Sequence, residues 1–448
     1  MERAAGAALA ADLRDEAKEL YGTLVDWHRS HANPAAQARA MSQYGEVLMR
    51  SPEGPPAAVR YMEAARDELT STIEESEMAV LEAELGLTYL MDGDFKNGAA
   101  TIDRSLQVVE RSEELNTIAE LLASKGWAVA ELGRTREGLA ILRGTIPFAE
   151  LHGFQNAYFR ASMNLSALGS LEDPREALTV ALQAMERAER FGYNTWAGYL
   201  ASNATHCQFV VGDWDECLRL WSHIDREEMD RSLKLNLASG AARVTAYRDG
   251  ARAAEALMLP ESEVAAFTSP QDTVAFRETR ANVRFVERRF ADAYSDAMAA
   301  ADVDIAGSPV TGLSMAAHAA LWLRDPERLE ATLTRLDAVR QHTSVAASVR
   351  LGLGAGLDAV QHRTDDSRAT YAQAIARLDD VGARFEAVLA RLERAVFLET
   401  SDDERQAFLA DARTGLEGLG ASALLGFMDE GAAAESPADS VPEIVQRA

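Results

Sequence analysis

Short turn signals recur along this 448-residue chain at a nearly constant spacing. Successive signals lie 39, 40, 40, 39, 38, 38, 37, 40 and 37 residues apart. They stand at Gly54, Gly93, Gly133, Asp173, Gly212, Gly250, Arg288, Asp325, Asp365 and Asp402. The stretches between them carry apolar residues at the i, i+3, i+4 and i+7 spacing of a helix, and the period-two alternation of a strand is missing. This period predicts an all-α array of about ten helical hairpins, because each hairpin can bury its apolar faces only against its neighbours.

The period also changes the expected domain organisation. Length alone suggests roughly three globular domains, whereas a repeat array predicts one elongated solenoid over residues 37–430. We expect residues 1–36 to be an N-terminal capping region that begins with an irregular helix, because a terminal unit must present a soluble outer face. Residues 431–448 are rich in alanine, proline and acidic residues, so they are predicted to form a disordered acidic tail.

Composition excludes several classes of function. Lys plus Arg is 45 and Asp plus Glu is 71, which gives a formal charge of −26. A chain this acidic is a poor match for nucleic acid or an anionic membrane surface, and it favours basic partners. No apolar stretch approaches the length of a transmembrane helix. The two cysteines, Cys207 and Cys217, form no disulfide framework, so we expect a cytoplasmic protein.

Two repeats carry a more specific pattern. In the first, Gly86 precedes a turn at Gly93-Asp94-Phe95 and Gly98 follows it; in the second, Gly212-Asp213-Trp214 is followed by Cys217. This pattern resembles the tetratricopeptide repeat, in which small residues of the two helices pack together and an aromatic residue follows the turn. Small side chains allow helices to cross closely, so Gly86 is expected opposite Gly98, and Gly126 opposite Gly138.

The resemblance implies a right-handed superhelix. The period of about 39 residues, in place of 34, and the weak repeats around Gly250 and Asp325 are similar to the long-period arrays of bacterial MalT-like and LuxR-type regulators and of cyclase–ATPase proteins. The sequence has no phosphate-binding loop, no cyclase strands and no basic output helix. The resemblance therefore implies the sensor or docking portion alone, either as a fragment of a larger regulator or as a stand-alone relative.

No residue pattern predicts catalysis, a metal or a cofactor. The glycine-rich stretch at Gly352, Gly354 and Gly356 is not a dinucleotide fingerprint. The pattern G-x-G-x-x-G would need a third glycine at position 357, which is leucine. His28 and His31 have the spacing of metal ligands but no further ligands, so we interpret them as a solvated surface pair. Cys207 and Cys217 are interpreted as two small buried thiols, with a redox pair as the alternative.

Polar and aromatic residues on the first helix of each hairpin are the candidate site, because that helix is expected to line a concave groove for a ligand or partner. The candidates are Trp127, Tyr158, Arg160, Asn164, Tyr199, Asn203, His206, Arg280, Asn282 and His318. Asparagine is a poor choice inside a helix. The three asparagines therefore either clamp the backbone of a ligand or form hydrogen bonds between adjacent hairpins, and we favour the second role. For the aromatic residues we favour a place in the core.

Together these observations predict a non-catalytic module that binds a protein or peptide, as the sensor or docking part of a signalling or transcription regulator. One alternative is a structural adaptor or oligomerisation scaffold without a ligand. Others are a domain that binds a small-molecule inducer, or a degenerate regulator that has lost its ATPase. The sequence leaves the oligomeric state open.

Overall fold

The computed structural model describes residues 1–10, 13–51, 53–112, 114–224, 229, 231–264, 270–303 and 308–429. All regular secondary structure in these residues is helical, which confirms the predicted all-α class. Two helices, α1 (Glu2–Ala10) and α2 (Arg14–Ser30), precede the array, where the sequence predicted one irregular helix. The predicted acidic tail, 431–448, lies outside the described residues.

Ten helical hairpins follow in the described residues, numbered here as hairpins 1 to 10. Their first helices are α3 (Pro34–Arg50), α5 (Glu75–Met91), α7 (Leu115–Glu131), α9 (Gln155–Gly169), α11 (Asn194–Val211), α13 (Arg231–Asp249), α16 (Pro270–Val286), α18 (Ser308–Trp322), α20 (Ser344–Val360) and α22 (Arg384–Phe397). Their second helices are α4 (Gly54–Leu69), α6 (Phe95–Ser112), α8 (Thr135–His152), α10 (Pro174–Arg190), α12 (Trp214–His223), α14 (Ala251–Glu255), α17 (Phe290–Ala301), α19 (Pro326–Asp337), α21 (Thr364–Val381) and α23 (Asp402–Leu419). The remaining short elements are α15 (Glu261–Val264), α24 (Ser422–Leu425) and the 3-10 helix η1 (Gly426–Asp429).

Each predicted turn signal falls in a hairpin turn or within the first two residues of the helix that follows it. Glycine provides the left-handed residue in some turns, as at Gly93 with φ +86°. In hairpins 7, 8 and 9 this residue is Arg288, Arg324 or His362, with φ between +53° and +63°. These three turns therefore place an L-residue in a conformation that L-residues adopt rarely. The weak repeat around Gly250 has a second helix of only five residues, α14.

The predicted glycine pairs face each other inside their hairpins. A Cβ atom added to Gly98 would lie 3.1 Å from the carbonyl oxygen of Gly86. One added to Gly138 would lie 2.4 Å from the carbonyl oxygen of Gly126. The second crossing is closer than a Cβ atom permits and the first leaves little space for one, which favours glycine on both helices.

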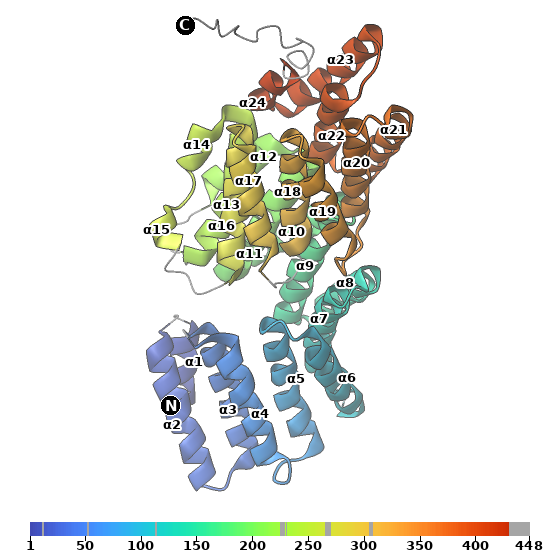
Figure 1. Ribbon diagram of the computed structural model, residues 1–448. Coiled ribbons are helices and arrows are strands. Elements are labelled where there is room, and N and C mark those ends of the chain that lie inside the picture. The colour runs from blue at the N-terminus through green and yellow to red at the C-terminus, as the bar shows by residue number, and fades with distance from the viewer. Residues whose placement is uncertain are drawn as a thin grey trace, which may run out of the picture.

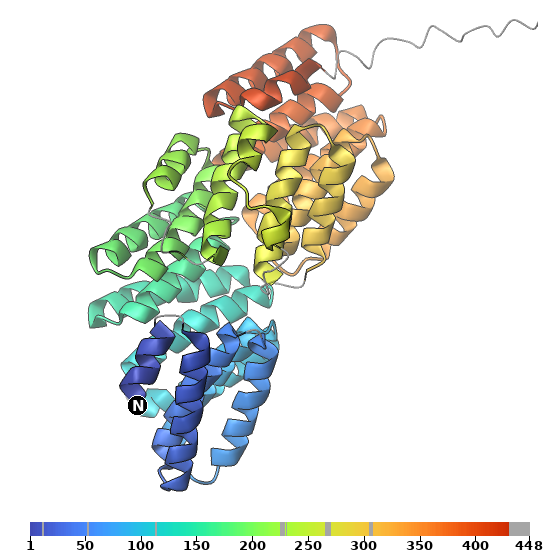
Figure 2. The same ribbon diagram turned by 90° about the vertical axis from the view of Figure 1, so that its left-hand side faces the viewer.

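The molecule is elongated, with the N-terminal helices at one end and α23 and α24 at the other (Figures 1 and 2). Hairpins 5 to 10 curve until α22 contacts α11, so that hairpin 10 lies against hairpin 5. We call this contact between the last hairpins and the middle of the array the closure. A single apolar core runs through it, whereas the N-terminal hairpins have separate, smaller clusters. No helix in the described part of the chain is both long enough and apolar enough to span a membrane.

Backbone and side-chain hydrogen bonds complete the closure at the start of hairpin 9. The amide of Val345 donates to the carbonyl oxygen of Leu171 over 2.9 Å. The amide of Ser344 donates to Glu172 Oε2 over 2.7 Å. Gln341 Nε2, in the connection between α19 and α20, donates to Glu131 Oε2 at the end of α7 over 2.6 Å. Hairpins 3 and 4 therefore also hold the C-terminal part of the array.

Candidate functional site

The structure separates the ten candidate groove residues into groups with different surroundings. Three of them, His206, Asn282 and His318, line one cavity. Asn164, Asn203, Tyr158 and Trp127 pack or form hydrogen bonds between helices, and Arg280 belongs to an ion-pair network. Tyr199 is exposed, and Arg160 is half-buried.

The asparagines form the hydrogen bonds between hairpins that the sequence favoured. Asn164 Nδ2 donates to the carbonyl oxygen of Ala123 in the preceding hairpin over 3.3 Å. Asn203 Nδ2 lies 3.0 Å from the carbonyl oxygen of Met163 and 2.9 Å from Ser166 Oγ. Asn282 accepts a 2.7 Å hydrogen bond from the hydroxyl of Tyr247, again in the preceding hairpin. Each amide therefore connects one hairpin to the hairpin before it.

Two of the aromatic candidates pack between helices. Tyr158 is 8% exposed, and the guanidinium of Arg187 lies 4.4 Å from its ring centroid. The edge of Trp127 meets Phe95 at 5.8 Å between centroids. These rings fill space between helices, as the sequence analysis favoured for the aromatic residues.

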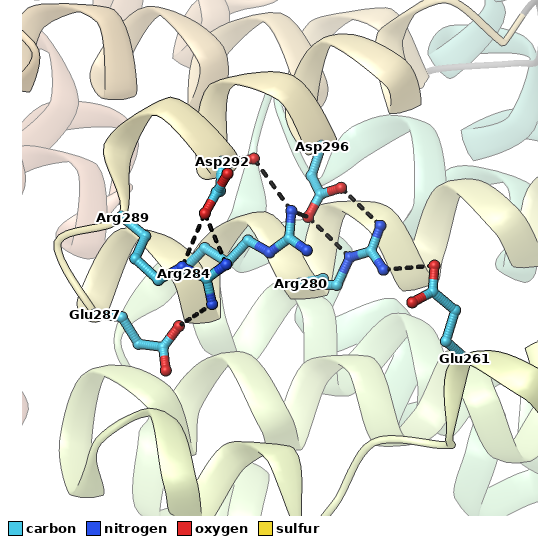
Figure 3. Close-up of polar contacts among 7 residues, drawn as sticks. All are labelled: Glu261, Arg280, Arg284, Glu287, Arg289, Asp292 and Asp296. Atoms are coloured by element: carbon cyan, nitrogen blue, oxygen red, sulfur yellow. Dashed lines mark hydrogen bonds and ion pairs between the residues drawn. The ribbon is translucent and has the colours of Figure 1, made fainter.

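Arg280 lies in a network of ion pairs between α16 and α17 (Figure 3). Its Nε and Nη2 atoms donate to the two carboxylate oxygens of Asp296 over 2.8 and 2.7 Å. Arg284 Nη1 reaches the same carboxylate at 2.7 Å, and Glu261 pairs with Arg280 at 2.8 Å. Asp296 is 5% exposed, so two guanidinium groups compensate one buried charge. Arg280 is therefore an ion-pair residue of hairpin 7.

The concave face at the closure is filled by the chain itself. Phe385, at the start of α22, lies among aromatic rings of hairpins 5 and 6, with centroid distances of 4.6 Å to Phe209, 5.9 Å to Trp214 and 4.7 Å to Tyr247. Ten of the fourteen residues of α22 are buried. The groove predicted from the first helices is therefore not open at hairpins 5 and 6, because α22 occupies it.

What is left of that concave face is a small, partly open cavity of about 60 Å³. It is too small for a drug-sized ligand, which needs about 300–1,000 Å³, but it holds several water-sized groups. The polar residues that line it come from hairpins 5 to 8 and 10: His206, Arg243, Tyr247, Asn282, Thr311, Ser314, His318 and Glu386. Arg243, Tyr247 and Glu386 were not among the sequence candidates, because nothing local distinguishes them from residues of a solvated helix face.

His206 and Arg243 meet at one side of the cavity. Arg243 Nη2 lies 3.1 Å from His206 Nδ1, and its guanidinium is 5.3 Å from the ring centroid of Phe209. Burial, together with the Arg243 charge, lowers the pKa of His206 to about 3, so the imidazole is neutral and Nδ1 accepts. Burial also raises the pKa of nearby Glu278 to about 7, although Arg243 acts in the opposite direction.

His318 lies at another side of the cavity between two carboxylates. Its Nδ1 atom is 2.7 Å from Glu393 Oε1, and its Nε2 atom is 3.5 Å from Glu386 Oε2. Burial lowers the pKa of His318, but the Glu393 and Glu386 carboxylates outweigh it and raise the pKa to about 10. The imidazole is therefore a buried cation at neutral pH.

The remaining motifs have structural explanations. Cys207 and Cys217 are free and buried, and burial raises the pKa of each thiol to about 12, which confirms the interpretation as inert core residues. His31 is exposed, but His28 is 6% exposed, so the expected solvated pair is wrong for His28. The side chain of His28 is covered by α1, where Glu2 lies 3.4 Å from Nε2. The glycines at 352–356 lie inside helix α20.

A second feature lies on the surface where one hairpin passes to the next. We define the aromatic rim as Leu151, Phe154, Phe191, Tyr193, Trp196 and Tyr199, at the junctions α8–α9 and α10–α11. Leu151 is 80% exposed, Phe191 57%, Tyr199 42% and Tyr193 39%. Beneath them, buried Phe159 contacts Tyr193 at 5.3 Å and Trp196 at 6.0 Å between centroids.

Only Tyr199 of this rim was a sequence candidate. A periodic signal for Phe154 and Tyr193 is present, because Leu115, Phe154 and Tyr193 are separated by 39 residues each and lie at or directly before the starts of α7, α9 and α11. Phe154 and Tyr193 lie at the junctions between hairpins, outside the first helices that were expected to line a groove.

No protein-family model matches this chain, and no curated protein matches it.

Proposed function

We propose that this chain is a non-catalytic protein-binding module that takes a partner segment on its aromatic rim. The observation that carries the proposal is the concentration of exposed apolar residues. Of the ten large apolar side chains that are exposed in the described part of the chain, four belong to the rim. Contiguous exposed apolar patches on soluble proteins are typical of interaction sites, and tyrosine and tryptophan are common anchors in them.

The partner is a segment with apolar anchors and basic residues. The net charge of −26 creates a negative potential that attracts basic segments and accelerates their association. Beside the rim, Glu150 pairs with Arg187 and Glu186 with Arg190, so these charges are paired and the rings of the rim contribute the contact area. The attraction is long-range, and the rim supplies the short-range contact.

We further propose that the hairpins are a divergent tetratricopeptide-like array and that the module is the sensor or docking part of a signalling or transcription regulator. The regular period, the close glycine crossings and the hydrogen bonds between hairpins support the first proposal. The resemblance of the repeat pattern supports the second.

The test uses a photo-reactive phenylalanine analogue at Phe191 in the full chain, with the same analogue at Met91 as control. Met91 is 47% exposed at the end of α5 and lies outside the rim. Capture from a lysate of the organism that encodes the chain should give a partner that crosslinks at position 191 and not at 91. The double variant Phe191→Ser/Tyr199→Ser should lose it, whereas Met91→Ser should retain it. A partner that both variants bind equally would place the interface elsewhere.

The same variants decide between a partner protein and a second copy of this chain. If the rim is an oligomerisation surface, light scattering shows a dimer in the wild type and a monomer in Phe191→Ser/Tyr199→Ser, and the crosslink at 191 joins identical chains. That result would favour the scaffold over the binding module. Binding of a basic partner should also weaken as salt rises, since the attraction between exposed charges is screened.

A further inference from the structure

The small cavity at the closure has a buried cation with no carboxylate in direct contact. Arg243 is 7% exposed and lines the cavity. Two of its N–H groups are used, by the carbonyl oxygen of Ser239 at 3.3 Å and by His206 Nδ1 at 3.1 Å. Among the described residues no carboxylate oxygen lies within 4 Å of the guanidinium. A buried guanidinium in this state has unused N–H donors. The Glu278 carboxyl group acts on its charge from nearby but makes no contact with it.

The His318 side of the same cavity has the opposite charge. One imidazolium, His318, faces the two carboxylates of Glu393 and Glu386, which leaves one negative charge in excess. His318 is 5% exposed, and neither its Nε2 atom nor Glu386 Oε2 has a hydrogen-bond partner in the described chain. The two atoms are 3.5 Å apart, too far for a good hydrogen bond. The cavity beside His318 and Glu386 therefore has space and negative charge for a hydrogen-bond donor of a ligand.

These two sides exclude the simplest occupants. A lone anion on Arg243 would share a cavity of about 60 Å³ with the negative charge of Glu386. A lone cation beside Glu386 would be repelled by Arg243. The hydroxyl of Tyr247 donates a hydrogen bond to Asn282 over 2.7 Å. Burial raises the pKa of Tyr247 most; Glu386 also raises it and Arg243 lowers it, so both charged groups act on this residue. A molecule that carries a negative and a positive group can compensate both sides at once.

We propose that the cavity binds a small zwitterion of the amino-acid class, with its carboxylate on the Arg243 guanidinium and its ammonium group on Glu386. The volume restricts the ligand to the smallest members, such as glycine or alanine. The ligand would contact α13, α18 and α22, and it would thus join hairpins 6 and 8 to hairpin 10 across the closure. This site is independent of the aromatic rim.

The experiment titrates the full chain with glycine, alanine, acetate, methylamine and glycine betaine, using calorimetry and the shift of the unfolding temperature. Glycine or alanine should bind and raise the unfolding temperature, since a ligand that binds only the folded state stabilises it. Acetate and methylamine, alone or mixed, should not. Betaine, whose ammonium group has no N–H and is bulky, should not bind either.

Three variants locate the site. Arg243→Met should abolish binding and Glu386→Gln should weaken it at least about tenfold, whereas Arg350→Met should bind as the wild type does. Arg350 is the matched control, because its guanidinium pairs with Asp337 on the surface at 2.8 Å. If Arg243→Met does not fold, Arg243→Lys replaces it, and the loss of the planar fork should still weaken binding about tenfold.

The proposal is overturned if no amino acid binds the wild type, which is the result for a cavity that holds only water. It is also overturned if acetate alone gives the same shift, which would indicate a simple anion site. Binding that survives both Arg243→Met and Glu386→Gln would place the ligand outside the cavity.

Discussion

The ring of Phe385 packs against the ring of Phe209 with 4.6 Å between centroids, and this contact joins hairpin 10 to hairpin 5. A linear solenoid has contacts only between neighbouring hairpins, so its stability is a sum of local terms. Here a residue of the last hairpin completes a core begun five hairpins earlier. The closure should therefore make hairpins 5 to 10 unfold more cooperatively than an open array would.

Replacing Phe385 by alanine should release the closure. Removal of a buried phenylalanine costs about 3–5 kcal/mol, and here it also removes the contacts that connect the two ends of the curve. Hydrogen exchange should accelerate in α22 and at the junction with hairpin 5, and small-angle scattering should show a larger radius of gyration. Phe408→Ala is the control, because Phe408 lies half-buried on α23 beneath Arg394. Equal expansion in both variants would contradict a specific role for Phe385.

His318 should make the stability of the closure dependent on pH. Its folded pKa of about 10 lies above the unfolded value of 6.5, so the folded state binds the extra proton. The stabilisation is therefore complete below about pH 6.5 and is lost as pH rises through about 10. At neutral pH, His318→Asn should lower the free energy of unfolding by about 3–5 kcal/mol, since it leaves buried carboxylates without their partner.

Denaturant unfolding of the wild type and His318→Asn at a series of pH values between about 6 and 10 tests this. The difference between the two proteins should shrink towards the alkaline end. His362→Asn is the control, because His362 pairs with Glu399 at the surface and should have little effect at any pH. A difference that is constant with pH would show that His318 is neutral in the folded protein.

Asn203 should stabilise the array without any ligand. Asn203→Ala removes hydrogen bonds to Met163 and Ser166 of the preceding hairpin, which should cost about 1–2 kcal/mol. Asn97→Ala should cost less, since the amide of Asn97 bonds to Asp94 in an exposed turn of its own hairpin. The measurement is thermal unfolding of the purified chain. An Asn203→Ala variant as stable as the wild type would return this residue to the list of ligand candidates.

Two glycines of α8 should respond in opposite ways to alanine. A Cβ at position 138 would lie 2.4 Å from the Gly126 carbonyl oxygen and 2.8 Å from Ala130 Cβ, so Gly138→Ala should destabilise by about 1–3 kcal/mol or more. Gly144 is exposed in the same helix with nothing within 4 Å of an added Cβ. Gly144→Ala should therefore stabilise by about 0.5–1 kcal/mol through helix propensity. Calorimetric melting of both variants provides the comparison, and a stabilised Gly138→Ala would show that the crossing is looser than described.

Much of the local architecture could be predicted from the sequence. The turn signals placed ten hairpins, the paired glycines indicated two close crossings, and the recurring asparagines indicated hydrogen bonds between neighbouring hairpins. These features depend on interactions within one hairpin or between adjacent ones. Helical periodicity and turn chemistry record such interactions directly.

The site was only partly predictable. His206, Asn282 and His318 were candidates, but Arg243, Tyr247 and Glu386, which surround the same cavity, were not. Arg280 was a candidate, yet Asp296 occupies its guanidinium. In a sequence, an arginine that faces a cavity and one that pairs across a hairpin have the same helical spacing.

By itself, the sequence determined that this protein is an array of ten helical hairpins with a strongly acidic surface. Only the tertiary structure decided that the array closes, that Phe385 of α22 fills the concave face at Phe209 and Tyr247, and that a charged cavity remains inside. The reason is that curvature accumulates from small rotations between successive hairpins. The sequence of a single repeat does not indicate whether the accumulated rotation brings hairpin 10 into contact with hairpin 5.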